Sequence, residues 1–475
     1  MFIGDFYYEI PTSLPTLTNT SIYFIAFCFI VFVFARFYKS ILRPLVLLVA
    51  NVIFLYSFSL NNLVWLFVLA LLGYIFGIIL SKKYFKYNIY IFISIYVLVL
   101  FYFKYAGLFI NVDSLIMPLG LSFYSFKIMS YLFDINNNKI KVELNPIYYF
   151  NYAMFFPTII AGPINRADRF IKELRSNKPF NYKQAKGGAF QMILGILEKK
   201  IIVDYIAIIV NNIYANNELM GANVILAMVL YSFQLYLDFD ALSNIAIGSA
   251  RLLGFNLHRN FASPYLACNL QEFWRRWHIS LSTWFKDYLY IPLGGSKKGI
   301  FRKYLNIVIV FVVSGAWHGS TVNFIIWGLL HGLIQVIEDL LIKSFKKVID
   351  NKYINFVFRI IGIIFNFGLV TFIWLFFRFQ TIGEVKEIIS RLTTSQPLNF
   401  ELIGLVPNEV KWLIVLLIVV IIIDIIRYFT SFIKLFNRLY FPFRWTIYCI
   451  LIVAFLIFGV YGGTFESSDF IYQFF

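Results

Sequence analysis

The chain has 475 residues, of which 60% are hydrophobic and only 14% are charged, and its mean hydropathy is +0.77. Soluble domains contain about 45–50% apolar and about 25% charged residues, so this composition excludes a water-soluble globule and a disordered chain and indicates a polytopic membrane protein. The formal net charge of +17 favours cytoplasmic loops that meet anionic membrane lipids, and we expect no nucleic-acid partner. Cys28, Cys268 and Cys449 lie far apart without metal-ligand spacing, so we expect neither a metal site nor a disulfide framework.

Apolar segments long enough for membrane spans follow one another along the whole chain, since a helix needs roughly 20 mostly apolar residues to cross the bilayer. The thirteen candidates are 21–35, 44–60, 63–80, 88–103, 115–133, 147–162, 190–210, 223–248, 304–317, 321–342, 358–378, 411–427 and 445–462. The first twenty residues carry Asp5 and Glu9 and no Lys or Arg. That is the wrong flank for a cleavable signal peptide, so we expect the first span to be retained.

Positive charges collect in alternate connections, and this pattern predicts the orientation of the spans. The basic residues of these connections are Arg36, Lys39, Arg43, Lys82, Lys83, Lys86, Lys343, Lys346, Lys347, Lys352, Arg427, Lys434, Arg438 and Arg444. The other connections are acidic or neutral, as around Glu218, in 379–410 and in the tail with Glu466 and Asp469. We therefore expect a multi-pass membrane protein with both chain ends outside, which requires an even number of crossings.

Segment 147–162 is the one that we expect not to cross. It is short, contains Pro157 and Gly162, and is followed by four basic residues within 166–175. A re-entrant hairpin there restores an even count, because irregular backbone is tolerated at membrane depth where protein or a cavity surrounds it. The sequence thus predicts an all-α polytopic membrane protein, with about twelve transmembrane helices plus re-entrant and interfacial helices around an internal passage.

Residues 269–290, on the predicted cytoplasmic side, have the pattern of one amphipathic helix. Asn269 is a predicted N-cap, and Glu272 follows at the spacing of a capping box. Such a helix is typical of the membrane interface, with tryptophans at head-group level and arginines at anionic lipid. His278 falls on the apolar face, where an imidazole needs a partner. The residues of that face are Trp274, Trp277, His278, Leu281, Trp284, Phe285 and Tyr288.

A second histidine lies inside a predicted span. Residues 304–319 are nearly all apolar, and His318 is roughly 21 Å along their helix, past the membrane midplane. An ionisable group at this depth is a candidate functional residue, and imidazole suits proton transfer near neutral pH. The small residues of Ser314–Gly319 allow close helix packing or an opening for a ligand.

Segment 223–248 carries polar residues in an otherwise apolar helix, and they permit two interpretations. In one they are hydrogen-bonding contacts between helices. In the other, Asp238 or Asn244 orients a histidine or holds part of a substrate. His258, in a polar loop, and His331, in a later span, are interpreted as structural. The polar residues of the segment are Gln234, Asp238, Asp240, Ser243 and Asn244.

Several of these motifs resemble the signature of the membrane-bound O-acyltransferases. The stretches that carry the resemblance are Phe273–Ser282 (FWRRWHISLS), Asp287–Gly295 (DYLYIPLGG), Ser314–Gly319 (SGAWHG), Trp327–Gly328 and His331–Gly332. Those that resemble its alginate O-acetyltransferase branch are Leu121–Phe126 (LSFYSF), Phe155–Pro157 (FFP) and Ala161–Ile164 (AGPI). Asp238–Asn244 (DFDALSN) departs from that branch's usual DFSGYSD. The departure weakens the carry-over of roles to 240–244 and points to an acceptor other than alginate.

The resemblance implies a single membrane domain, 1–475, with core motifs at about 115–335, peripheral helices 1–114 and 336–475, and a central tunnel. It implies an acyltransferase without a permanently bound cofactor, in which an acyl group, acetyl above all, arrives from cytoplasmic acetyl-CoA or an acyl-carrier thioester. His318 is then the general base, and His278 positions the thioester or polarises its carbonyl. The residues expected to hold the donor's phosphates are Arg275, Arg276, Lys297 and Lys298, with Arg302 and Lys303 nearby. Those expected along the tunnel are Trp274, Trp317, Asp238 and Asn244.

The acceptor implied by the resemblance is a hydroxyl of an extracellular polysaccharide, reached directly or through an extracytoplasmic acetyltransferase- or esterase-like partner. The alternative within the same family is a D-alanyl transferase for teichoic acids that is loaded by an acyl-carrier protein. A transporter would also place polar groups at the midplane, but the inverted repeats that would support it are not apparent in the sequence. A non-catalytic scaffold of a polysaccharide export complex would tolerate replacement of both histidines.

Overall fold

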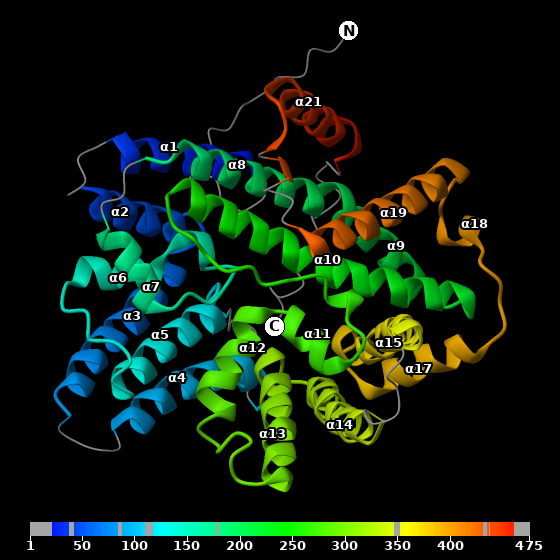
Figure 1. Cartoon of the computed structure of the whole chain (residues 1–475), viewed down its shortest axis with the longest axis horizontal. Coiled ribbons are helices and arrows are strands. Elements are labelled where there is room, and N and C mark those ends of the chain that lie inside the picture. Colours follow the sequence, from blue (N-terminus) through cyan, green and yellow to red (C-terminus); the bar gives the residue numbers. More distant parts are fainter. Residues whose placement is uncertain are drawn as a thin grey trace.

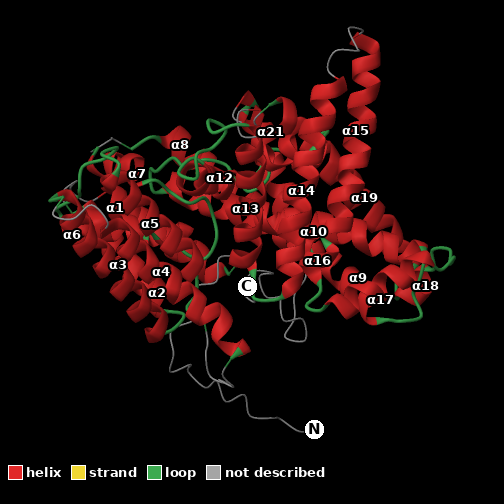
Figure 2. Cartoon of the chain, turned by 90° about the horizontal axis from the view of Figure 1, so that it is seen from below, coloured by secondary structure: helices red, strands yellow, loops and turns green. Residues whose placement is uncertain are grey.

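The computed structural model describes residues 21–37, 42–83, 88–109, 117–176, 180–345, 352–430, 435–436 and 438–459. These residues form helices joined by turns and loops, with no strand among them, so the predicted all-α class is confirmed (Figures 1 and 2). The N-terminal residues and the acidic tail on which the predicted positions of both chain ends rest lie outside the described residues.

Seven helices from the N-terminal part of the chain form one side of the molecule, on the left of Figure 1. They are α1 (Ile22–Phe37), α2 (Arg43–Tyr56), α3 (Leu60–Ser81), α4 (Asn88–Tyr105) with the turn η1 (Ala106–Leu108), α5 (Leu121–Asn136), α6 (Pro146–Met154) with η2 (Phe156–Thr158), and α7 (Ala167–Arg175). Through the middle run α8 (Tyr182–Leu197), the π-helical η3 (Glu198–Val203), α9 (Asp204–Ala215) and α10 (Ala222–Leu252).

The remaining helices begin below α10 and complete the other side (Figure 1). At the lower centre lie η4 (Pro264–Leu266), α11 (Leu270–Arg276), α12 (Ile279–Phe285), the π-helical η5 (Lys286–Tyr290) and α13 (Ile300–His318). The rest are α14 (Val322–Phe345), α15 (Lys352–Ile373), α16 (Leu375–Arg378), α17 (Ile382–Thr393), α18 (Phe400–Ile403), α19 (Pro407–Phe429) and α21 (Phe441–Phe458). In Figure 2, α15 projects beyond the body of the molecule.

Side-chain caps fix where several of these helices begin. A Ser, Asn or Thr at the N-cap accepts a hydrogen bond from an amide of the first turn, which otherwise has no partner inside the helix. The N-caps of α3, α6, α8, α11 and α17 are Ser59, Asn145, Asn181, Asn269 and Thr381.

Eight helices within the described ranges are long and apolar enough to cross a membrane, and α1 and α2 contain shorter apolar segments. Four of the twelve predicted crossings are absent from the eight, and α1 and α2 correspond to two of these four. Segment 115–133 overlaps only the sixteen-residue α5, which buries polar residues such as Lys127. Segment 190–210 contains the charged π-helical η3. The count of about twelve spans therefore stays a prediction, as does the single domain. The eight are Leu60–Ser81, Asn88–Leu108, Ala222–Leu252, Ile300–His318, Val322–Leu341, Phe356–Arg378, Pro407–Phe429 and Phe441–Phe458.

The segment expected not to cross is broken in the structure. α6 ends at Met154, and the backbone continues as η2 and an irregular stretch up to α7. The Lys127 ammonium of α5 donates to the carbonyls of Tyr152 and Ala153 (3.2 and 3.4 Å) and to Thr158 Oγ1 (3.3 Å). Buried protein groups thus satisfy the irregular backbone, as a segment at membrane depth requires. Its re-entrant path through the bilayer stays a prediction.

α10 joins the two sides of the molecule. Its first half, up to Phe239, packs into the apolar core that α14, α15 and α17 share. Its second half, from Leu242 on, packs into the core of α1 to α7. Glycines bring α8 against α10, because a Cβ on Gly248 would lie 2.5 Å from the Met192 amide nitrogen and 2.7 Å from the Gly188 carbonyl oxygen.

Contacts between connections agree with the predicted alternation of sides. Arg391 lies in a stretch predicted outside and donates to the carbonyls of Ile213 and Tyr214 (2.8 and 3.1 Å), near another predicted outer connection. At the face predicted to be cytoplasmic, Lys303 pairs with Asp339 at 2.7 Å. Each contact joins residues that the charge pattern places on the same side. The orientation of the two faces in the cell stays a prediction.

Gly248→Leu should destabilise the protein, because the new side chain would meet the backbone of α8 and force the two helices apart. We expect a loss of about 1–3 kcal/mol, as for other overpacked cores, measured as a lower midpoint of thermal unfolding in detergent. Gly368→Leu in α15 is the matched control, since a Cβ there meets nothing within 4 Å. Equal midpoints for the two variants would contradict the close α8–α10 contact.

Candidate active site

The predicted single helix over 269–290 is wrong, because the chain breaks between α11 and α12. His278 stands at the break with φ of +40°, in the left-handed region. Few non-glycine residues adopt this conformation, and those that do often lie at functional sites. The aromatic periodicity of the sequence is the same on both sides of the break, so it gave no sign of it.

A neighbouring segment causes the break by taking the hydrogen bonds that a continuous helix would use. The Arg276 carbonyl accepts from the Ala262 amide at 3.0 Å. The Ile279 amide donates to the Asn260 carbonyl at 2.8 Å. In an uninterrupted helix both groups would bond four residues along the same chain. The residues 260–262 therefore divide the predicted helix and turn His278 away from its axis.

The predicted N-cap is present, but the capping box is not reciprocal. Asn269 Oδ1 accepts from the Glu272 amide at 2.8 Å. The Glu272 carboxylate, however, accepts from the Cys268 amide at 3.0 Å. The interfacial interpretation is wrong for Trp277 and Trp284, since the protein core buries both.

Aromatic side chains surround the imidazole of His278. Its side chain is 2% exposed, and the rings of Phe123, Phe239 and Phe261 surround it with centroids 6.0–6.3 Å away. Neither ring nitrogen has a partner within the described part of the protein. Burial lowers the pKa of His278 to about 4, so the ring is neutral near pH 7.

His318 is the last residue of α13 and is 4% exposed. Its ring packs against Trp317, Trp327 and Phe377, with centroids 4.6–5.2 Å apart. Phe123 connects the surroundings of the two histidines, since its ring centroid is 6.3 Å from those of both His278 and Trp317. The structure thus brings both predicted histidines into one aromatic region.

A pocket of about 440 Å³ runs along α13 toward His318. Its residues on α13 recur at helical spacing, and they span roughly 16 Å from the first to the last. His318 follows the last of them by one turn on the same helix face. Trp274 and Arg275 also line this pocket, and their roles toward a donor stay predictions. The five residues of α13 are Lys303, Ile307, Val310, Phe311 and Ser314.

The four predicted donor-binding residues separate in the structure. Arg275 is exposed and lines the pocket. Arg276 has a structural role instead, because it pairs with Glu272 at 2.7 Å, donates to the Ala262 carbonyl and stacks over a tyrosine ring. Lys297 and Lys298 are exposed in the turn before α13 and do not line this pocket. Their contact with a donor stays a prediction.

The expectation that Asp238 or Asn244 orients a histidine is not met. Asp238 pairs with Lys199 at 2.8 Å. Asn244 donates to Asp240 and accepts from Gln191, both at 3.0 Å. These bonds join α10 to α8 and η3, which is the helix-joining role that the sequence left open.

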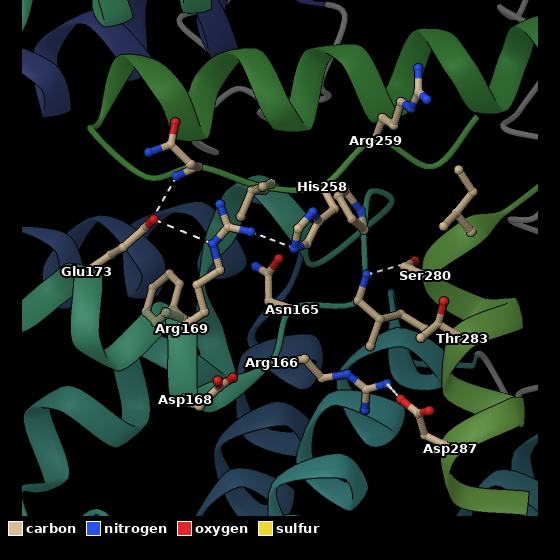
Figure 3. A pocket seen from close by; sticks show the side chains of 16 residues that line it. Asn165, Arg166, Asp168, Arg169, Glu173, His258, Arg259, Ser280, Thr283 and Asp287 are labelled. Carbon is tan, nitrogen blue, oxygen red and sulfur yellow. Dashed lines mark hydrogen bonds and ion pairs between the residues drawn. The ribbon is translucent and has the colours of Figure 1, made fainter. Parts of the chain in front are cut away.

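A second pocket, of about 670 Å³, lies on the other face of α12 (Figure 3). Its charged side chains pair with one another, as Arg166 does with Asp287 at 3.0 Å. Arg169 reaches both Glu173 and His258 across the pocket (Figure 3), and this contact gives His258 a structural partner. Two residues of α12 line both pockets, and they are Ile279 and Thr283.

Several residues around the histidines carried no distinct signal in the sequence. His331, predicted to be structural, accepts from Trp274 Nε1 at 3.4 Å and packs against Trp327, which also touches His318. Phe377 comes from α16, far along the chain. Lys104 contacts the backbone carbonyl of His318, and its only feature in the sequence is a charge at the end of an apolar span. Tertiary packing brings these residues to the histidines.

Comparison with known proteins gives the site a family. Residues 136–381 match the family described as MBOAT, membrane-bound O-acyltransferase family. A probable alginate O-acetylase of Pseudomonas putida is 35% identical over 257 residues, which cover 50% of this chain and 52% of that protein. The peptidoglycan O-acetyltransferase of Helicobacter pylori is 32% identical over 304 residues, covering 58% and 56%. The teichoic acid D-alanyltransferase of Bacillus subtilis is 29% identical over 276 residues, covering 54% and 68%.

The chain thus spans about half the length of the acetylases that it matches. The family match itself covers more than half of this chain and includes both histidines, α10 and the pocket along α13. The chain therefore belongs to the membrane-bound O-acyltransferase family.

Proposed function

We propose that this protein is a membrane O-acyltransferase that passes an acyl group, acetyl above all, from a cytoplasmic thioester to hydroxyls of an extracellular polysaccharide. The observation that carries the proposal is the order of groups along α13. Arg275 and Lys303 line the same groove as Ile307, Val310 and Phe311, and Ser314, the last of its α13 residues, lies one turn before His318. In an acyl-CoA the anionic phosphates, the pantetheine chain and the acyl group follow one another. We place the phosphates at the basic residues, the pantetheine chain along the apolar residues and the acyl group near His318.

In this proposal His318 is the general base. Its imidazole takes the proton of the acceptor hydroxyl while the hydroxyl oxygen attacks the thioester carbonyl. The new C–O ester bond forms, the C–S bond breaks, and the departing thiolate receives the proton from the imidazolium. His278, neutral because its pKa is lowered to about 4, donates a hydrogen bond to the carbonyl oxygen, on which negative charge develops. The thioester is a co-substrate, and the step needs no permanently bound cofactor.

The acetylases among the relatives favour acetyl-CoA as the donor and a polysaccharide as the acceptor. Transfer takes place directly or through an extracytoplasmic acetyltransferase- or esterase-like partner, from a protein placed in the plasma membrane with its basic loops inside. The match to a teichoic acid D-alanyltransferase supports a second candidate at lower identity, in which an acyl-carrier protein delivers D-alanine.

His318→Ala should lower transfer about 10²–10⁴-fold, because that is the contribution of a positioned general base. The measurement is the O-acyl content of the polysaccharide made by cells that carry the variant at wild-type membrane levels. His258→Ala is the matched control, since that exposed histidine contacts Arg169 away from the groove. Wild-type O-acyl content in His318→Ala would refute the general-base role.

Arg275→Glu should weaken donor binding, because it replaces a cation at the groove entrance with an anion. Loss of one charge-assisted hydrogen bond corresponds to about a tenfold or larger rise in the KM for acetyl-CoA. The measurement is acetyl transfer by the protein in proteoliposomes at varied donor concentration. Lys183→Glu in α8, an exposed residue outside the groove lining, controls for the change in net charge. An unchanged KM in Arg275→Glu would remove Arg275 from the donor site.

The two donor classes can be separated by labelling. Membranes that contain the protein should transfer radiolabel from acetyl-CoA to polysaccharide in a His318-dependent manner. The parallel reaction supplies radiolabelled D-alanyl-carrier protein. Label that enters only from the carrier protein, and only into teichoic acid, would replace acetylation by the second candidate.

A further inference from the structure

Two neighbouring residues of α4 hold the C-terminal turn of α13. The Lys104 ammonium donates to the carbonyls of Trp317 and His318, the latter at 3.4 Å. The Tyr105 hydroxyl lies 2.7 Å and 3.2 Å from the carbonyl oxygens of Ala316 and Gly319. The last carbonyls of a helix have no partner inside it. Four consecutive carbonyls around His318 therefore depend on α4.

The charge of Lys104 is directed at this helix end. No carboxylate forms an ion pair with Lys104 among the residues that the structure describes. Its ammonium instead lies 5.3 Å from the ring centroid of Trp317. A cation at a helix C-terminus is favourable because the carbonyl ends carry partial negative charge. Protein surrounds the contact, so solvent screens it less than it would a surface pair.

The same contact supports the aromatic side chains that lie near both histidines. Trp317, below the Lys104 ammonium, stacks on Phe126 with centroids 5.1 Å apart and meets Phe123 edge to face at 6.3 Å. Phe123 in turn faces His278. A displaced Trp317 would therefore also shift the aromatic side chains that pack near His278 and His318.

We propose that Lys104 is a positioning residue that fixes the orientation of His318 toward the reacting groups. Tyr105 contributes by bonding to carbonyls of the same turn. The inference rests on the proposed function of His318 as general base. Lys104 does not touch the substrate in this proposal, and it acts by fixing the turn from which the His318 ring projects. A misplacement of about 1 Å can cost about 100-fold in rate.

The test compares Lys104→Met and Lys104→Arg as full-length proteins in proteoliposomes, with acetyl-CoA as the donor and kcat and KM measured separately. Lys104→Met should lower kcat about 100-fold and leave the donor KM within twofold, because the donor entrance lies at the other end of α13. Lys104→Arg keeps the cation and should recover most of the lost kcat. Lys82→Met, at the exposed C-cap of α3, is the control and should match wild type.

A double variant separates positioning from general stabilisation. If Lys104 acts through His318, adding Lys104→Met to His318→Ala should lower the residual rate no further. An additional loss that multiplies the two effects would overturn the inference, as would an unchanged kcat in Lys104→Met. An active His318→Ala would instead refute the proposed function, so the two failures can be told apart.

Tyr105→Phe covers the case in which Lys104→Met does not fold. This change removes one hydroxyl, and we expect a several-fold fall in kcat with an unchanged donor KM. Wild-type kcat in Tyr105→Phe, together with no rescue by Lys104→Arg, would exclude the α4 contact as a determinant of the rate.

Discussion

The backbone bonds between residues 260–262 and the ends of α11 and α12 determine the form of this site. They divide one amphipathic pattern into two short helices and hold His278 at φ of +40°. A strained residue of this kind costs about 1–3 kcal/mol. The two bonds replace those that a continuous helix would form, so the break leaves neither the Arg276 carbonyl nor the Ile279 amide without a partner. The result is a histidine that faces an aromatic interior instead of the membrane interface, with a pocket on each face of α12.

Much of the architecture was accessible from the sequence, because local rules govern it. Apolar length set the helices, the charge pattern set which connections share a side, and Asn269 was recognisable as an N-cap. His318 stood out because an ionisable group inside an apolar span is costly. The break at His278 and the ion pair of Arg276 were not accessible, since both depend on partners from other parts of the fold.

Polar groups inside this molecule are mostly paired with one another, and that makes the exceptions informative. Lys199 satisfies Asp238 and Asp204, and Arg427 meets Asp240. Such pairs join helices, which explains why polar residues in an apolar span could not be assigned to a site from the sequence alone. The His278 ring nitrogens are two of several buried atoms to which no described group bonds. What distinguishes His278 is its left-handed backbone at the break between α11 and α12.

The helices that the sequence placed at the periphery take part in the centre. The family match covers residues 136–381, and α4 lies before it. Lys104 and Tyr105 of α4 nevertheless contact the carbonyls of the turn that ends in His318. α4 and α13 end on the same predicted side, so the charge pattern and the tertiary contact support one another. The geometry of His318 is therefore a property of two distant segments, and the motif around it describes only one of them.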